Sequence, residues 1–167
     1  NAGGTNSDLG LFIDNDWTLG ALTLTGGARL DRWSIRDGFF SERDANGLPV
    51  AAETFADRAG WDASFRGGLL LRPSNTLALR AAAYSGLRLP TLNELYRPFV
   101  VFPVVTQANA GLRNERLEGF EAGLDVTPTD ALSLSLTAFD NRVKNAIANV
   151  TIDTNLRERQ NIDAIRA

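Results

Sequence analysis

The alternation of apolar and polar residues limits the fold of this chain more than any other feature of its sequence. Between residues 22 and 31, leucine, glycine and alanine at even positions alternate with threonine, glycine, arginine and aspartate at odd positions. Because successive side chains of a strand point to opposite faces, this pattern predicts a β-strand with one apolar and one polar face. The chain is therefore expected to be all-β, with about six strands and the start of a seventh. The alternation recurs over residues 9–17, 61–72, 77–84, 117–126 and 132–139, and a last strand begins near Arg157.

The connections between these strands alternate in length. Three are short, Ile35–Gly60 and Leu89–Arg116 are long, and Val143–Leu156 is moderate. A barrel threaded through a membrane has short turns on one side and long loops on the other, and strands of about ten residues suffice to cross it. The pattern predicts an antiparallel up-and-down segment of a transmembrane β-barrel, with short periplasmic turns, long extracellular loops and every neighbouring strand pair antiparallel. A soluble β-sandwich with one face in water is the alternative. The short turns are Thr18–Ala21, Pro73–Thr76 and Pro128–Asp130.

Charged residues fall on one parity of the predicted strands, which assigns the two faces. Charges are tolerated in an aqueous lumen but are costly against lipid. We therefore expect Arg29, Arg66, Arg80 and Glu121 to face the lumen. The apolar parity is expected to face lipid, and it includes Leu24, Phe65, Leu69, Leu79, Leu124 and Leu134.

Two of the three tryptophans have the position of a membrane-interface aromatic girdle. Trp17 and Trp61 lie at predicted strand ends with the apolar parity, as such a girdle requires. Trp33 has the opposite parity, so we expect it to face the lumen, to follow a bulge or to lie in a loop. Packing in a core is the alternative for each of them.

Composition argues against several classes of function. The 167 residues include no cysteine and no histidine, and the net charge is −3. An acidic balance disfavours nucleic-acid binding. Without Cys or His the sequence contains no nucleophile with an activating base and no metal-ligand spacing. We therefore expect no enzyme, no catalytic residue, no metal site and no cofactor.

Two segments of the longest connection resemble motifs of TonB-dependent outer-membrane receptors. Arg88–Tyr96 resembles R-x-P-T-x-x-E-L-Y, and Asn109–Glu115 resembles N-P-x-L-x-P-E, with Ala110 and Asn114 in place of the prolines. Within the first segment, Thr-Leu-Asn-Glu fits a capping box and predicts a helical turn. Residues 11–17, 27–33, 137–145 and 159–161 also resemble family strands, in the family's order. The matching motif residues are Arg88, Pro90, Thr91, Glu94, Tyr96, Asn109, Leu112 and Glu115.

The resemblance implies a large barrel, usually of 22 strands, that is closed by an amino-terminal plug domain. Residues 1–167 would be a partial barrel domain, without the plug and the remaining strands. The implied location is the outer membrane of a Gram-negative bacterium. The implied partners are membrane lipid, a TonB complex acting through the missing plug, and a small-molecule ligand such as a ferric siderophore.

Four residues of the Leu89–Arg116 connection are candidates for binding that ligand. Aromatic rings and a cation are suited to chelates or sugar rings, which selects Tyr96, Arg97, Phe99 and Phe102. Packing of the loop on itself is the alternative for each. A second hypothesis for the whole chain is a soluble all-β binding module that presents its loops to a glycan or a protein.

Overall fold

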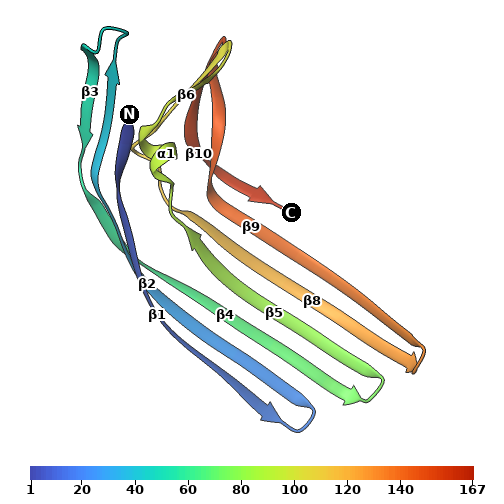
Figure 1. The fold of residues 1–167 in the computed structure, drawn as a ribbon. Coiled ribbons are helices and arrows are strands. Elements are labelled where there is room, and N and C mark those ends of the chain that lie inside the picture. Colours follow the sequence, from blue (N-terminus) through green and yellow to red (C-terminus); the bar gives the residue numbers. More distant parts are fainter.

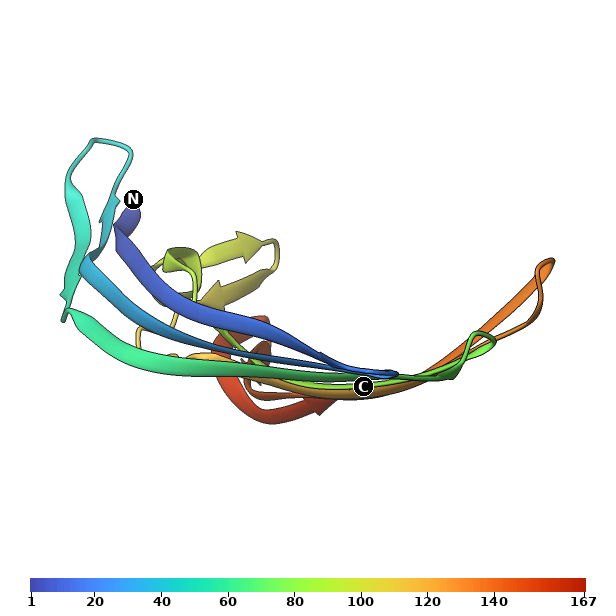
Figure 2. The same ribbon diagram turned by 90° about the horizontal axis from the view of Figure 1, so that it is seen from below.

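The computed structural model describes residues 1–167 as one curved sheet with a short helix on its concave side (Figure 1; Figure 2). Seven long strands form the wall in the order β1-β2-β4-β5-β8-β9-β10, which confirms the expectation of six strands and the start of a seventh. No helix of the structure is long and apolar enough to cross a membrane. The elements are β1 (Ala2–Leu19), β2 (Leu22–Arg43), β3 (Pro49–Phe55), β4 (Arg58–Ser74), β5 (Leu77–Arg88), α1 (Leu92–Tyr96), β6 (Phe99–Val101), β7 (Val104–Gln107), β8 (Glu115–Thr129), β9 (Leu132–Asp153) and β10 (Leu156–Arg166).

The connections lie at the two ends of the sheet as predicted. The turns that join β1 to β2, β4 to β5 and β8 to β9 all lie at the lower right of Figure 1. The longer connections, including the one that carries α1, lie at the opposite end. All neighbouring wall strands are antiparallel.

One strand pair contradicts the expectation that every neighbouring pair is antiparallel. β7 lies parallel to β10, with register Leu156↔Val105 to Glu158↔Gln107. The expectation was wrong here because β7 is not a wall strand. It belongs to the β6–β7 hairpin of the long loop, and the hairpin rather than the up-and-down path of the wall sets its direction.

The strands are also longer than the predicted ten residues, and β2 and β9 each have 22. Much of the predicted loop Ile35–Gly60 is a continuation of β2, β3 and β4, with β3 paired to β2. Likewise, β9 continues to Asp153 and a two-residue turn leads into β10. These extensions lack the apolar alternation of the other strand segments, so the sequence pattern does not reveal them.

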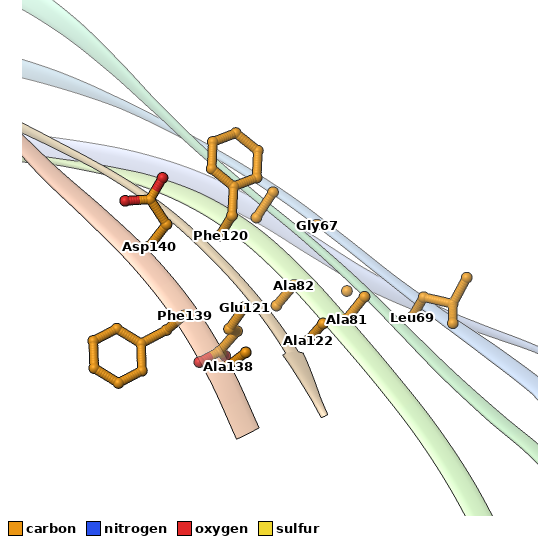
Figure 3. Close-up of a pocket in the computed structure, with 12 residues that line it drawn as sticks. Gly67, Leu69, Ala81, Ala82, Phe120, Glu121, Ala122, Ala138, Phe139 and Asp140 are labelled. Atoms are coloured by element: carbon orange, nitrogen blue, oxygen red, sulfur yellow. The ribbon is translucent and has the colours of Figure 1, made fainter. Parts of the chain in front are cut away.

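The register places the predicted lipid-facing residues on one face of the sheet. Ladder partners share a face, and side chains alternate along each strand. Figure 3 shows this alternation, with Phe120 and Asp140 on one side of the sheet and Glu121 and Phe139 on the other. The apolar face carries a row of leucines across six strands, and nothing in the chain covers it. The row runs Leu19, Leu22, Leu71, Leu79, Leu124, Leu136.

The opposite face carries the predicted charges as ion pairs. Arg80 Nε lies 3.0 Å from Asp125 Oδ2, Arg29 Nη2 lies 2.6 Å from Asp31 Oδ1, and Arg66 pairs with Asp14. Glu121 shares this face. The Arg80–Asp125 pair joins the neighbouring strands β5 and β8, and the Arg66–Asp14 pair reaches across β2 from β4 to β1. Arg29 and Asp31 lie two residues apart on β2. Ion pairs therefore connect strands across the polar face.

Each tryptophan lies on the face of the sheet that its parity in the sequence predicts. Trp17 and Trp61 lie on the apolar face, near the two ends of the strands, with 51% and 64% of their surfaces exposed. Trp33 lies on the polar face, where it is buried and its Nε1 donates a hydrogen bond of 3.0 Å to Asp62.

The wall divides at its loop end. The ladder between β4 and β5 stops at Arg66↔Tyr84, and the Ser85 hydroxyl accepts a hydrogen bond from Phe65 N at 2.9 Å. Beyond this point β4 stays paired with β2 as far as Arg58, while β5 stays paired with β8 (Figure 1). The small buried core lies at this end, beneath α1, and consists of Ile35, Leu95, Tyr96 and Leu112.

Candidate functional site

The helix α1 forms because its first turn is capped locally. The Thr91 hydroxyl accepts a hydrogen bond from Glu94 N at 3.2 Å, and the Glu94 carboxylate accepts one from Thr91 N at 2.8 Å. This reciprocal arrangement confirms the predicted capping box. The preceding Pro90 is fully buried.

Arg88 joins the two motifs at the base of the loop. Its guanidinium lies 2.7 Å from a Glu94 oxygen and 2.8 Å from a Glu115 oxygen. Burial alone raises the pKa of the Glu94 carboxyl and is the largest single influence. The hydrogen bonds from Thr91 and Arg88 outweigh it, so that this pKa lies below its ordinary value. One arginine fork therefore holds both ends of a connection of more than twenty residues.

The second motif closes the loop around α1. Asn109 N donates to the Glu94 carbonyl at 3.1 Å, and the Asn109 side chain donates to the Arg159 carbonyl at 2.9 Å. Leu112 is 1% exposed and packs in the core with Ile35 and Leu95. The contacts of the motif residues thus hold the loop in place.

The two positions where the family motif has proline, Ala110 and Asn114, make polar contacts with β4. The Ala110 carbonyl accepts a hydrogen bond of 3.1 Å from Arg58 on β4. The Asn114 amide donates one of 3.3 Å to Asp62, also on β4. The loop therefore contacts the strand from which β5 has diverged.

Arg159 on β10 is a supporting residue that the sequence reasoning missed. Its guanidinium donates to the Asn93 carbonyl and, at 3.0 Å, to the Arg97 carbonyl at the end of α1. It also lies 5.0 Å from the centre of the Phe99 ring. Residues 159–161 resembled a family strand, but the residues next to Arg159 in the sequence give no sign of this role. The carbonyl groups that Arg159 contacts belong to residues more than sixty positions earlier in the chain.

The four predicted ligand-binding residues have different surroundings. Tyr96 is buried, and its ring stacks on Phe55 with 4.6 Å between ring centres. Gly38 leaves room for that ring, since a Cβ there would lie 2.6 Å from it. Arg97 and Phe99 are exposed, and Phe102 at the tip of the β6–β7 hairpin is 93% exposed. Phe99 and Phe102 thus lie on the β6–β7 hairpin and Arg97 on the link between α1 and that hairpin, whereas Tyr96 packs against β2 and β3.

The comparisons with known proteins agree with this architecture. No curated protein matches the chain. The family model described as "TonB dependent receptor-like, beta-barrel" matches residues 1–167.

This chain spans 30% or less of the length of three solved structures of similar fold. The Serratia marcescens hemophore receptor HasR, solved as a double mutant with its hemophore HasA and heme, has a TM-score of 0.80 and 21% identity over 98% of this chain and 30% of its own. The copper transporter OprC has a TM-score of 0.74 and 20% identity over 96% of this chain and 25% of its own. The FrpB iron transporter from Neisseria meningitidis has a TM-score of 0.66 and 20% identity over 99% of this chain and 23% of its own.

These structures share the wall strands, and the family match extends over the whole chain. The chain belongs to the TonB-dependent receptor-like β-barrel family, a family of transport receptors rather than enzymes.

Proposed function

We propose that this chain is part of the barrel wall of a receptor that imports a scarce ligand across the outer membrane of a Gram-negative bacterium. The family match over residues 1–167 carries the proposal. The uncovered apolar face and the ion-paired opposite face suit a wall between lipid and an aqueous lumen. A soluble binding module is disfavoured, because it would leave that broad apolar face in water.

A ferric siderophore is our first candidate for the ligand. Proteins of the same fold include the ferric-catecholate import receptor Fiu from E. coli and a Pseudomonas aeruginosa ferric enterobactin receptor in complex with enterobactin, at 15% and 16% identity. We propose Arg97, Phe99 and Phe102 as contacts, since the exposed rings offer flat apolar faces and the guanidinium can pair with an anionic chelate. Tyr96 would support this hairpin from within the loop.

We also propose that a TonB complex drives the transport through a plug domain. In this proposal the plug and the remaining strands lie outside residues 1–167. The loop that carries α1 would then close over the lumen side of the wall, where the plug would lie.

The proposal is tested by growth and uptake. A strain that lacks the receptor would be grown with one nutrient source at a time. The sources are ferric siderophores, heme, copper, cobalamin and glycans. We expect loss of growth and of labelled uptake with a ferric siderophore, and the same loss in a TonB-deficient strain. Normal growth of the deletion strain on every source would contradict the proposed transport function. Loss of growth with heme or copper alone would identify that compound, instead of a ferric siderophore, as the ligand.

The loop contacts are tested by complementation. Receptors with Arg97→Ala or Phe102→Ala should take up the ligand more weakly. Leu48→Ala, at a residue that is also exposed but lies beside the β2–β3 turn, serves as the matched control. Equal ligand uptake by all three variants would show that Arg97 and Phe102 do not contact the ligand.

A further inference from the structure

A short sheet at the loop end of the molecule aligns β10 with the hairpin that carries two of the proposed ligand contacts. In this sheet β7 pairs with β6 on one side and with β10 on the other. Thr106 on β7 is the ladder partner of both Phe99 on β6 and Arg157 on β10. Ladder partners share a face and adjacent strands lie about 4.8 Å apart, so the Phe99 and Arg157 backbones are about 10 Å apart on one face. Arg157 therefore lies on the same surface as Phe99.

The contacts of Arg159 show which way this surface is turned. Side chains two residues apart on a strand share a face, so Arg157 and Arg159 point to the same side of β10. The Arg159 guanidinium donates to the Arg97 carbonyl at 3.0 Å and lies 5.0 Å from the centre of the Phe99 ring. It contacts the end of α1, which lies on the concave side of the wall (Figure 2). Phe99 and Arg157 are thus on the α1 side of the sheet, and Arg159 is the residue that positions Phe99 and Arg97.

Arg97 and Arg157 carry charges that no carboxylate neutralises. Both residues are exposed, and neither forms an ion pair or lies over an aromatic ring. Glu158, the neighbour of Arg157, points to the other face of β10 and accepts a hydrogen bond from within that strand. Asp153 accepts a hydrogen bond from the backbone of the β9–β10 turn. Two free guanidinium groups therefore accompany the exposed Phe99 ring.

An anionic aromatic chelate suits this arrangement. Guanidinium groups form strong hydrogen bonds with oxyanions, and the exposed ring offers a flat surface to an aromatic group of the ligand. A ferric complex of three catecholates is a trianion with three aromatic rings, whereas a ferric complex of three hydroxamates is neutral. We propose that Arg157 is a further ligand contact and that, together with Arg97, it selects an anionic chelate over a neutral one. This inference rests on the proposed import of a ferric siderophore.

Binding of two chelates to the full-length receptor in detergent tests the proposal. Ferric enterobactin is the anionic probe and ferrichrome the neutral one, and quenching of tryptophan fluorescence gives the affinity. We expect ferric enterobactin to bind more tightly than ferrichrome. Arg157→Gln should weaken the binding of ferric enterobactin roughly tenfold, as expected for one lost charged hydrogen bond, and Arg157→Lys should restore most of it. Added salt should weaken this binding more in the unchanged receptor than in Arg157→Gln, because salt screens the charge that the substitution removes.

Arg36→Gln is the matched control. Arg36 is also exposed and forms no ion pair, but it lies on β2, outside the sheet of β10, β7 and β6. This variant should bind ferric enterobactin like the unchanged receptor, and a heat-shift gel verifies that each variant is folded.

Two results would overturn the role of Arg157 while leaving siderophore import intact. One is unchanged affinity in Arg157→Gln, and the other is equal weakening by Arg157→Gln and Arg157→Lys. Tighter binding of ferrichrome than of ferric enterobactin would overturn the selection of anionic chelates. If neither chelate bound to the unchanged receptor, the proposed siderophore function would be contradicted, and this inference with it.

Discussion

Replacing Leu124 by arginine would place a charge in the middle of the apolar face. Leu124 is opposite Leu79 on β5 and Leu136 on β9, so its side chain is surrounded by the leucine row. It precedes the turn residue Asp130 by six positions along β8. With a rise of about 3.3 Å per residue and a strand tilt of about 40°, that is about 15 Å, or half of a bilayer's hydrocarbon thickness.

An arginine at this depth should cost roughly 2–4 kcal/mol in the free energy of unfolding. The matched control is Ala82→Arg on β5, which lies at a similar distance from its turn but on the other face. There the new cation would be opposite Glu121, so we expect a change of about 1 kcal/mol or less.

The measurement is equilibrium unfolding of the full-length receptor in lipid vesicles with urea, followed by tryptophan fluorescence. A heat-shift gel would show the folded fraction directly. If the two variants lost equal stability, or if Ala82→Arg lost more, the assignment of the faces to lipid and lumen would be refuted.

Three further predictions concern the loop and the isolated chain. Because the folded pKa of Glu94 is lowered, its stabilisation of the loop should be complete above the ordinary carboxyl pKa and lost as the pH falls through the folded value. Hydrogen exchange of residues 91–97 across acidic pH checks this, and Glu94→Gln should remove the dependence. Arg159→Gln should destabilise the loop by roughly 1.5–3 kcal/mol, seen as faster exchange at residues 92–107, because it removes charged hydrogen bonds to two carbonyls. Residues 1–167 alone in water should aggregate, since the apolar face and two unpaired sheet edges stay exposed; a monomer with a cooperative thermal transition would argue against the barrel wall.

The sequence predicted the wall well because its signal is local. Each wall strand with an apolar face carries its own alternation, and the capping box of α1 lies within four residues. The contacts that position the loop are not local. Arg159 on β10 contacts the end of α1, and β7 pairs with β10 although about fifty residues separate them in the sequence. Sequence periodicity does not predict such contacts. Tyr96 illustrates the same limit, because its residue type does not show that Phe55 and Gly38 enclose the ring.

The divergence of β4 from β5 gives the two ends of the wall different mechanics. Below Ser85 the strands are joined by continuous backbone ladders, so that part resists deformation as one body. Above it, the strands fall into two groups that meet only through side chains and the loop, including Tyr96 against Phe55 and Arg58 against the Ala110 carbonyl. A ligand that displaces the loop would therefore change the width of the rim by separating these two groups, while the diameter of the wall within the membrane stays fixed.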